Sequence, residues 1–483
     1  MAVVSKKALT LTLARHFSTL TSNPITLTPK LIDPAPSPNP NAILDLSNTE
    51  PIFSSISTRS LIRSLAILQT LSIEPLVDVG IRTVRSQVVQ SSWLANKALM
   101  GVVKGTVYGH FCAGSGLDEV GRTVKELEGM GLKGILDYGS EDAEDGSGCD
   151  RNLSGFLEMV EMMSSLPRSA VSSACVKVTA ICPISLLERI SDLLRWQQKD
   201  PSLTLPWKSH SIPVLSDSSP LYQTPTKPLP LTETEELNLQ QSLNRLSTLC
   251  SRCAELNLSI LIDAEYSTVQ PAIDYFTYSA ALEFNKKPKS ESAMVLGTVQ
   301  CYLRDAKERL AGIVEAAERE GFVVGVKLVR GAYTREREMA AALGVESPIH
   351  GSIGETHRCY DECASFMLER IAGGSVSLVL ATHNVESGKA AAAKAEELGI
   401  SKGNRNLQFA QLMGMADGLS LGLKNTGFQV NKYLPYGTVD QVIPYLLRRA
   451  EENRGMLSAS TLDRDILRKE IRRRMSAAVL GKN

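Results

Sequence analysis

Two apolar segments, VVGVKLVR at residues 323–330 and VSLVLAT at residues 376–382, decide the fold of this 483-residue chain. Both are short, rich in β-branched residues and mostly apolar, which is typical of strands buried on both faces of a parallel sheet. Six more segments of the same kind surround them in the sequence. They are GILDYG (134–139), VKVTAI (176–181), LSILID (258–263), MVLGTVQC (294–301), LQFAQL (407–412) and FQVNKYL (428–434).

Amphipathic helices are predicted between these segments. Thr232 and Glu235 form a capping-box pattern before one of them, and Gly321 and Gly399 follow two others at the position where glycine commonly ends a helix. The predicted helices span 184–198, 237–256, 303–320 and 387–398. Eight strands alternating with helices predict an α/β fold, a (β/α)8 barrel, with an open doubly wound sheet as the second interpretation.

The regions outside the barrel have other compositions. Residues 1–32 hold Lys and Arg, many Ser and Thr and no acid, which predicts an organelle transit peptide, mitochondrial or plastid. Residues 33–51 begin with alternating prolines and predict an extended linker. A helical region is expected over 52–110, before a barrel over 111–470. Residues 201–231 contain seven Pro and predict a surface insertion.

Charge and cysteine content exclude several classes of protein. The 52 Lys and Arg balance the 52 Asp and Glu, so nucleic acid is not an expected partner. No run of apolar residues is long enough for a membrane-spanning helix, and nine Cys do not suggest a disulfide scaffold. Cys250 and Cys253, or Cys359 and Cys363 near His357, are weak metal patterns, so no metal site is expected.

Polar side chains stand where the predicted strands end, which is where barrel enzymes carry their chemistry. Lys177 is the clearest case, because a charge between β-branched residues is unfavourable unless it is paired or binds something. The other positions are Asp137, Tyr138, Asp263, Glu265, Gln300, Arg330, Tyr333, Thr382, His383, Asn384, Gln411, Lys432 and Tyr433. An ordinary lysine whose ammonium reaches solvent at the barrel edge is the alternative for Lys177.

The helix after the last predicted strand carries a second polar pattern. Tyr445, Arg448, Arg449 and Glu452 follow at i, i+3, i+4 and i+7, so they share one helical face. An arginine pair beside an aromatic ring suits a small carboxylate, which a guanidinium binds through two parallel hydrogen bonds. A solvated charged face is the alternative interpretation.

Taken together, these segments resemble the proline dehydrogenase (proline oxidase) family, most closely its plant mitochondrial branch. The resemblance covers about residues 108–455. The matching motifs are FCAG (111–114), GLKGILDY (131–138), VKVTAICP (176–183), LIDAE (261–265), VQCYL (299–303), KLVRGAY (327–333), ATHN (381–384), FAQLMGM (409–415), KYLPYG (432–437) and YLLRRAEENRG (445–455). Their common order along the whole barrel makes the resemblance specific.

The resemblance implies a distorted (β/α)8 barrel with an N-terminal helical extension, holding FAD. It implies oxidation of L-proline to Δ1-pyrroline-5-carboxylate, the first step of proline catabolism to glutamate, by hydride transfer from the ring carbon beside nitrogen to flavin N5. The reduced flavin then passes its electrons to a respiratory-chain quinone. The implied location is the mitochondrion, with peripheral contact on the matrix side of the inner membrane.

The resemblance also implies residue roles. Arg448 and Arg449 would hold the proline carboxylate, with Lys177 below it and Glu452 on the same helical face as the arginines. The residues packing on or shaping the proline pocket would be Leu412, Tyr433, Tyr445, Asp263 and Tyr333. Those lining the flavin would be Gln300, Lys327, Val329, Gly331, Ala332, Thr356, Thr382, His383 and Asn384. Lys327 stands where some members of the family carry Arg, so a compact ammonium charge replaces the planar set of guanidinium donors.

Two other functions remain open from the residues alone. Lys177 could be the Schiff-base lysine of a barrel aldolase, in which case a carbonyl substrate and borohydride would trap it. A binding protein could retain the pocket without turnover, and it would hold flavin that proline never reduces.

Overall fold

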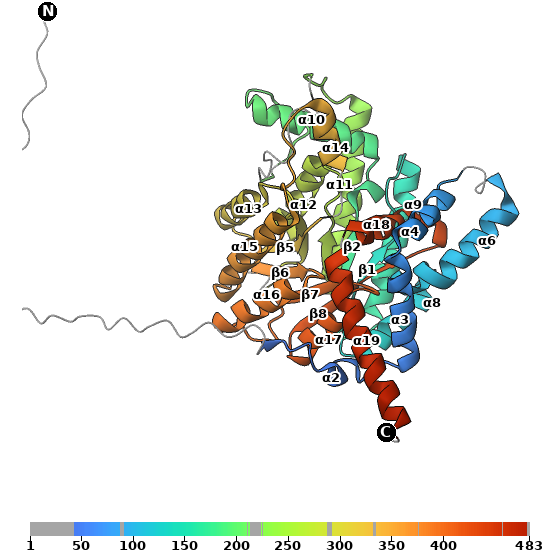
Figure 1. Cartoon of the computed structure of the whole chain (residues 1–483). Helices are drawn as coiled ribbons and strands as arrows, with labels where there is room; N and C mark the ends of the chain where they lie inside the picture. The colour runs from blue at the N-terminus through green and yellow to red at the C-terminus, as the bar shows by residue number, and fades with distance from the viewer. Residues whose placement is uncertain are drawn as a thin grey trace, which may run out of the picture. The chain divides into compact units, whose positions relative to one another are not determined.

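Eight parallel strands close into a barrel in chain order, each strand pairing with the next and β8 pairing with β1 (Figure 1). The computed structural model describes residues 43–86, 91–209, 211–212, 224, 226–286, 292–331, 335–374, 376–455 and 457–480. The strands are β1 (Lys133–Tyr138), β2 (Val171–Val176), β3 (Ser259–Ile262), β4 (Val295–Gln300), β5 (Val324–Val329), β6 (Val376–Ala381), β7 (Leu407–Leu412) and β8 (Gln429–Tyr436). The barrel prediction is confirmed, and the doubly wound sheet is wrong.

Seven of the eight strand predictions fall on a strand, within two residues at each end, and one is displaced. The predicted strand over 176–181 is wrong, because the second strand is VSSACV and ends at Val176. Residues Val178–Ala180 instead form a short 3-10 helix (η2). The two serines in VSSACV weakened its apolar signal, although Ser173 and Ser259 satisfy each other by a hydrogen bond of 2.7 Å across β2 and β3. Lys177 therefore lies directly after the strand rather than within it.

Helices cover the outside of the barrel. They are α8 (Leu117–Gly129), α9 (Gly146–Ser164), α10 (Ile184–Lys199), α11 (Glu233–Glu255), α12 (Gln270–Phe284), α13 (Ala306–Glu320), α14 (Arg335–Leu343), α15 (Ile353–Ala372), α16 (Val385–Glu397) and α17 (Asp417–Asn425). The capping box of Thr232 and Glu235 is present at the start of α11. Gly321 follows α13 in a left-handed conformation, with φ of 74°, so the predicted helix end is confirmed.

The described N-terminal residues form helices that pack beside the end of the chain. They are α2 (Thr49–Phe53), α3 (Thr58–Leu71), α4 (Glu74–Val84), α6 (Trp93–Val103), a π-helix (η1, Lys104–Tyr108) and α7 (Gly109–Phe111). Leu44 and Phe53 are fully buried in the main core. The linker prediction is therefore wrong for residues 43–51, because their apolar side chains fill a space beside α17 and α19.

Two helices follow the last strand, α18 (Val439–Gly455) and α19 (Leu457–Val479). Helix α19 packs along α3 and α2 (Figure 1). The buried Glu470 side chain of α19 accepts hydrogen bonds from Thr49, Arg473 and Arg474. Arg474 in turn donates to the carbonyl oxygens of Phe53 and Ile56. Burial raises the pKa of Glu470, but these donors outweigh it and lower the pKa to about 2.

Several expectations concern residues outside the described part of the chain. These are the transit peptide at 1–32, the first part of the linker and much of the insertion at 201–231. Among the described helices, none alone is long and apolar enough to cross a membrane. Helices α3 and α4 are together long and apolar enough for a membrane span, but they are bent by 83° at their junction.

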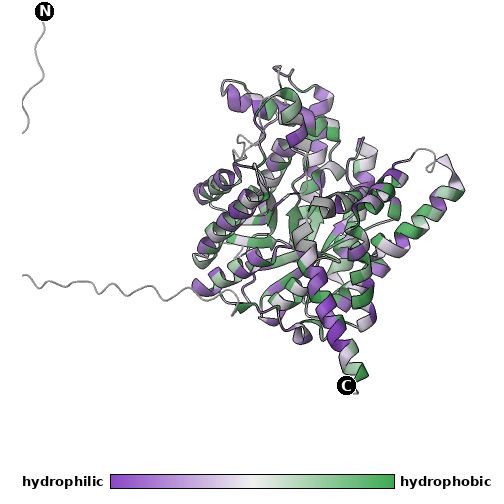
Figure 2. Cartoon of the chain, in the orientation of Figure 1, coloured by the Kyte–Doolittle hydropathy of each residue, from purple (hydrophilic) through white to green (hydrophobic). Residues whose placement is uncertain are grey.

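The side chains inside the barrel change from apolar to charged along the barrel axis. Apolar side chains such as Ile135, Leu261 and Val379 fill the middle of the strands, and Figure 2 shows the strands as mostly hydrophobic. Charged and polar side chains follow at the carboxyl ends, where Lys177 and Lys327 are less than one-tenth exposed. Because these charges are held away from water, each needs a fixed partner, and those partners define the site.

Candidate active site

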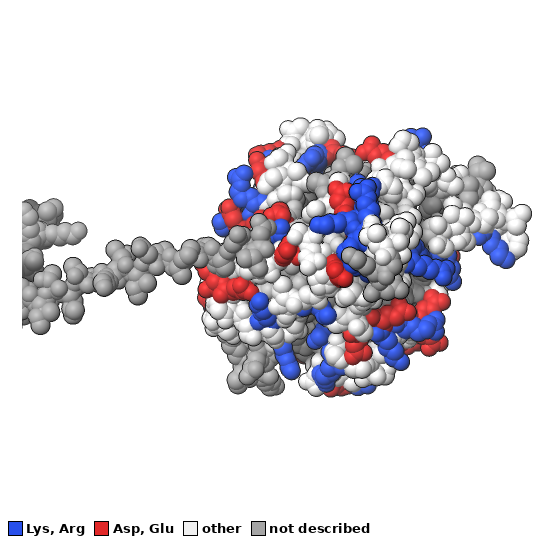
Figure 3. Space-filling view, turned by 60° about the horizontal axis from the view of Figure 1, so that its bottom comes forward, with Lys and Arg blue, Asp and Glu red and all other residues white. Residues whose placement is uncertain are grey.

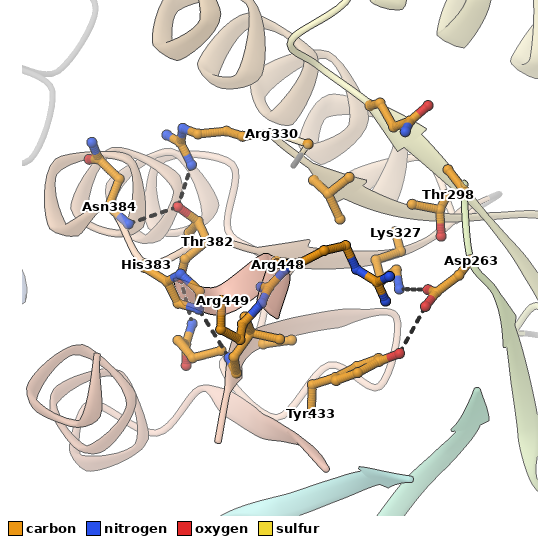
Figure 4. A pocket seen from close by; sticks show the side chains of 18 of the residues that line it. Asp263, Thr298, Lys327, Arg330, Thr382, His383, Asn384, Tyr433, Arg448 and Arg449 are labelled. Carbon is orange, nitrogen blue, oxygen red and sulfur yellow. Dashed lines mark hydrogen bonds and ion pairs between the residues drawn. The ribbon is translucent and has the colours of Figure 1, made fainter. Parts of the chain in front are cut away.

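A cavity of about 420 Å³ lies at the carboxyl ends of the strands, and α18 covers it. This volume is within the usual range for small-molecule sites. Residues from β1, β4, β5, β6, β7, β8 and α18, and Asp263 directly after β3, converge on it (Figure 4). The strands place these side chains because residues at a parallel strand's carboxyl end meet at one rim of a barrel.

A cluster of two lysines and two aspartates forms the barrel side of the cavity. The Lys177 Nζ donates to both carboxylate oxygens of Asp137, at 3.1 and 3.0 Å, and lies 3.9 Å from Asp263. Lys327 forms an ion pair with the other oxygen of Asp263. The Tyr433 hydroxyl donates to Asp263 at 2.8 Å, and Lys327 lies 5.3 Å from the centre of the Tyr433 ring. Asp263 therefore fixes the positions of both Lys327 and Tyr433.

These pairs keep Lys177, Lys327 and Asp263 charged, whereas burial raises the pKa of Asp137. Burial raises the pKa of Asp263, but Lys327 and Lys177 outweigh it and lower the pKa to about 2. Burial lowers the pKa of Lys177, but Asp137 and Asp263 raise it well above its usual value. A Schiff-base lysine needs a depressed pKa to be nucleophilic at neutral pH. The paired, fully charged Lys177 therefore does not fit the aldolase interpretation.

Helix α18 supplies the opposite side of the cavity. Tyr445, Arg448 and Arg449 all line it, so the face predicted from their spacing points inward (Figure 4). Glu141, in the loop after β1, accepts two hydrogen bonds of 2.8 Å from the Arg448 guanidinium. Burial raises the pKa of Glu141, but Arg448 outweighs it and lowers the pKa. The Arg449 guanidinium lies 5.1 Å from the centre of the Tyr445 ring.

A third group of polar atoms surrounds Arg330 at the end of β5. Its guanidinium donates to Thr382 Oγ1 at 2.5 Å and to His357 Nδ1 at 3.0 Å, and it also contacts Ser387. It stacks on the Tyr360 ring, 4.1 Å from the ring centre. All these contacts are with neutral groups, so the positive charge is not neutralised by them. The amino terminus of α16 begins beside it, capped by the Asn384 side chain. A guanidinium next to a helix amino terminus is suited to an anion such as a phosphate.

The His383 side chain is neutral and lies near several positively charged side chains. Its Nε2 accepts a hydrogen bond of 3.1 Å from the Leu412 backbone N–H. Burial, together with the positive charges of Arg449, Lys432 and Arg330, lowers the pKa of His383 to about 3. The ring therefore serves as an acceptor that connects β6 with β7 at the wall of the cavity.

Most of the predicted site residues meet in this cavity. Those that line it are Lys177, Asp263, Leu412, Tyr433, Tyr445, Arg448, Arg449, Gln300, Lys327, Val329, Gly331, Thr382, His383 and Asn384. Thr356 is not among them, and its hydroxyl bonds the Ser352 carbonyl within α15. Ala332 and Tyr333 lie outside the described residues, as does the side chain of Glu452 in α18.

Three positions that matter in the structure had no role assigned to them from the sequence. Thr298 lines the cavity two residues before Gln300 on β4, so the two-residue period of a strand could have identified it. Arg330 was noted at a strand end, but its surroundings depend on β6, α15 and α16, which no local pattern brings together. Glu141 lies in a loop, and only the fold shows that it pairs with Arg448.

None of the cysteines lines the cavity, although Cys175 accepts a hydrogen bond of 3.6 Å from the Tyr433 hydroxyl behind its wall. All nine are unbridged and buried, and Cys250 and Cys253 face the core on α11. Within the described ranges, no three His, Cys, Asp or Glu side chains are arranged to hold a metal ion.

The fold resembles bacterial structures of a larger protein. Proline utilization A from Bdellovibrio bacteriovorus, in a crystal structure inactivated by N-propargylglycine, matches with a TM-score of 0.57 and 21% identity. The match covers 82% of this chain and 37% of that one. At this level of identity the likeness concerns the fold alone.

The sequence comparisons are more specific. The family model described as "Proline dehydrogenase" matches residues 120–461. The mitochondrial proline dehydrogenase 2 of Arabidopsis thaliana is 47% identical over 470 residues, which cover 96% of this chain and 98% of that one. Proline dehydrogenase 1 of the same plant is 48% identical, over 93% and 90%. Human hydroxyproline dehydrogenase is 32% identical, over 86% and 91%. The chain belongs to the proline dehydrogenase family.

Proposed function

We propose that this chain oxidises L-proline to Δ1-pyrroline-5-carboxylate, using FAD held in the cavity and a quinone as electron acceptor. The arrangement that carries the proposal is the pair of arginines on α18 that faces the ordered lysine–aspartate cluster of the barrel. It provides one anchor for a small carboxylate and, opposite it, a rigid wall against which a ring can be positioned. Family membership and the close plant relatives support proline as the substrate.

The α18 arginines bind the proline carboxylate. Arg448 holds the Glu141 carboxylate through two hydrogen bonds, so the proline carboxylate would displace Glu141 or use the remaining guanidinium N–H groups. Arg449 lines the same cavity one residue further along the helix. A rigid anchor matters because a misplacement of about 1 Å can reduce the rate on the order of a hundredfold.

The barrel residues position the ring of the substrate. Tyr433 presents its ring to the cavity and its hydroxyl is fixed by Asp263. Leu412 and Tyr445 add apolar surface, which excludes water from the reacting carbon. Lys177 stays protonated below them and contributes positive potential to the carboxylate side of the pocket.

The residues of the cavity also fit FAD. Bound here, FAD would supply the acceptor for a hydride from the ring carbon beside nitrogen, and the electrons would then pass to the quinone. Lys327, held in place by its ion pair with Asp263, would offer the flavin ring a fixed positive charge. Arg330 and the first turn of α16 offer donors for the diphosphate. The space between Lys327 and Arg330 is lined by Gln300, Val329, Gly331 and Thr382 to Asn384.

Proline is the proposed substrate in preference to hydroxyproline. The Tyr433 hydroxyl already bonds Asp263, and its ring occupies the wall against which the pyrrolidine would pack. A hydroxyl on that ring would need room and a polar partner of its own. Several more distant relatives are hydroxyproline dehydrogenases, so both amino acids belong in the test.

The names of both Arabidopsis relatives place them in mitochondria, and this chain is mitochondrial by that similarity. We further propose that the enzyme works at the matrix side of the inner membrane, where the respiratory quinone lies. It would there begin the conversion of proline to glutamate. The basic, acid-free residues 1–32 support import into the organelle.

Anaerobic reduction by substrate tests the function. The purified full-length chain with FAD is expected to be yellow and to lose its visible absorbance when L-proline is added, and hydroxyproline is expected to bleach it much more slowly. Bound flavin that neither amino acid bleaches would identify a binding protein without turnover. A colourless chain that borohydride links to a carbonyl compound would restore the aldolase interpretation.

A further inference from the structure

Helix α6 presents an apolar face to solvent. Trp93, Leu94 and Val102 are 73%, 70% and 63% exposed, and Ala98 and Gly101 lie on the same face. Figure 1 shows α6 extending outward from the barrel at the right of the view, and Figure 2 shows it as largely hydrophobic. A soluble surface helix normally turns its apolar stripe inward, so this exposed stripe indicates a binding surface.

The stretch of sequence that contains α6 carries charges of one sign only. Residues 79–117 contain no Asp or Glu, but they include Arg82, Arg85, Lys97 and Lys104. The chain as a whole has equal numbers of acidic and basic residues, so this stretch is a local exception. In Figure 3 the projecting segment at the right is mostly white, with Lys or Arg in blue. This surface is therefore complementary to an anionic partner.

We propose that α6 lies in the surface of an anionic lipid bilayer and docks the enzyme there. An apolar stripe with tryptophan and lysine and without acids is typical of helices that lie in the membrane interface. The Lys97 Nζ lies 4.9 Å from the centre of the Trp93 ring, so a positive charge stands beside the exposed apolar stripe. With eleven residues, α6 is about 16 Å long, which is too short to span a bilayer.

Charge argues against two other occupants of this surface. In a symmetric dimer the same patch would face itself, which would place Lys97 and Lys104 near their own copies. Residues 1–32 of the same chain are themselves basic and acid-free, so they would also be repelled. An anionic lipid surface has neither problem, and each lysine near it adds favourable binding energy.

The position of α6 connects this surface with the active site. Leu99 and Val103, on its inner side, belong to an apolar cluster with Tyr108, Val442 and Tyr445. Tyr445 lines the cavity and stands on α18, the helix of the two arginines. Docking through α6 therefore brings the cavity close to the membrane, where the quinone dissolves. This inference rests on the proposed use of a membrane quinone.

Flotation with lipid vesicles tests the proposal on the full-length, FAD-bound enzyme. Vesicles of phosphatidylcholine are compared with vesicles that also contain about 20% cardiolipin. The unchanged enzyme is expected to float with the anionic vesicles, and the variant Leu94→Glu/Val102→Glu is expected to bind them about tenfold or more weakly. The matched control Leu237→Glu/Leu343→Glu, at exposed positions on α11 and α14, is expected to bind like the unchanged enzyme.

A second variant separates charge from apolar contact. Lys97→Glu is expected to weaken binding to anionic vesicles about tenfold and to leave binding to neutral vesicles unchanged. Equal binding by the unchanged enzyme and both α6 variants would overturn the proposal. So would a dimer that Leu94→Glu/Val102→Glu converts to monomers without any change in vesicle binding.

The same samples distinguish this proposal from the proposed function. All variants are expected to oxidise proline at the normal rate with a soluble dye as acceptor, because none of the changed residues lines the cavity. Vesicle binding without proline oxidation would refute the function and leave the docking surface intact. Normal dye reduction with no vesicle binding would refute the docking surface alone.

Discussion

On the barrel side of the cavity, the charges stand at strand ends and pair with one another, whereas on the α18 side they stand on a helix that covers the strands. Lys177, Lys327, Asp137 and Asp263 are linked within one cluster before any ligand arrives. Arg448 and Arg449 depend on the placement of α18, and Arg448 has its partner, Glu141, in a loop. The comparison teaches that the barrel side contributes preorganised electrostatics, while the helix side contributes recognition of the substrate.

The largest effect is expected from breaking the barrel cluster. Asp263→Asn leaves Lys327 buried without its ion pair and weakens the support of Lys177. Loss of one partner of a buried pair typically destabilises a protein by about 3–5 kcal/mol. Thermal and urea unfolding should show this loss, together with weaker retention of FAD.

The control for this change is Asp440→Asn, an exposed aspartate in the first turn of α18. It should alter the free energy of unfolding by no more than about 0.5 kcal/mol. If Asp263→Asn were equally harmless, the cluster would not be the rigid side of the cavity.

A smaller and more selective effect is expected on the helix side. Arg448→Met removes a bidentate anchor but leaves the barrel cluster intact, so the KM for proline should rise about a hundredfold while FAD stays bound. Steady-state kinetics and flavin absorbance measure the two properties separately. The exposed Arg472→Met on α19 serves as the matched control. Loss of FAD without a change in KM would reverse the roles assigned to the two sides.

The last effect concerns acid stability at the junction of the two sides, and it is absent at neutral pH and grows only as the pH falls. The folded-state pKa of His383, about 3, lies below its unfolded value of 6.5. Its contribution is therefore present above pH 6.5 and is lost as the pH falls toward 3, by on the order of 1 kcal/mol per pH unit. Protonation would also turn Nε2 into a donor facing the Leu412 N–H.

Urea unfolding between pH 7 and pH 4 measures this slope. His383→Asn should give a shallower decline of stability over the same range, with an unchanged dependence on urea concentration as the sign of an intact fold. An equally steep decline in the variant would show that His383 is not the group responsible.

The sequence predicted the barrel because period and composition are local properties. Strand β7 matches its predicted bounds, and the face of α18 with Tyr445, Arg448 and Arg449 follows from helical spacing alone. The sequence failed at β2, where Ser172 and Ser173 are satisfied by neighbouring strands that only the closed barrel supplies. Glu141 and the surroundings of Arg330 could not be predicted for the same reason, since their partners come from distant parts of the chain.

The contact between α19 and the first described helices has a consequence for synthesis of the chain. Thr49 and Glu470 share a hydrogen bond although they are 421 residues apart in the sequence. Arg474 donates a hydrogen bond to the Phe53 carbonyl oxygen at the end of α2. During translation, α2 and α3 leave the ribosome long before the helix that covers them exists. The N-terminal helices therefore lack their packing partner until nearly all of the chain has been made. This favours transport across a membrane before the native state can form.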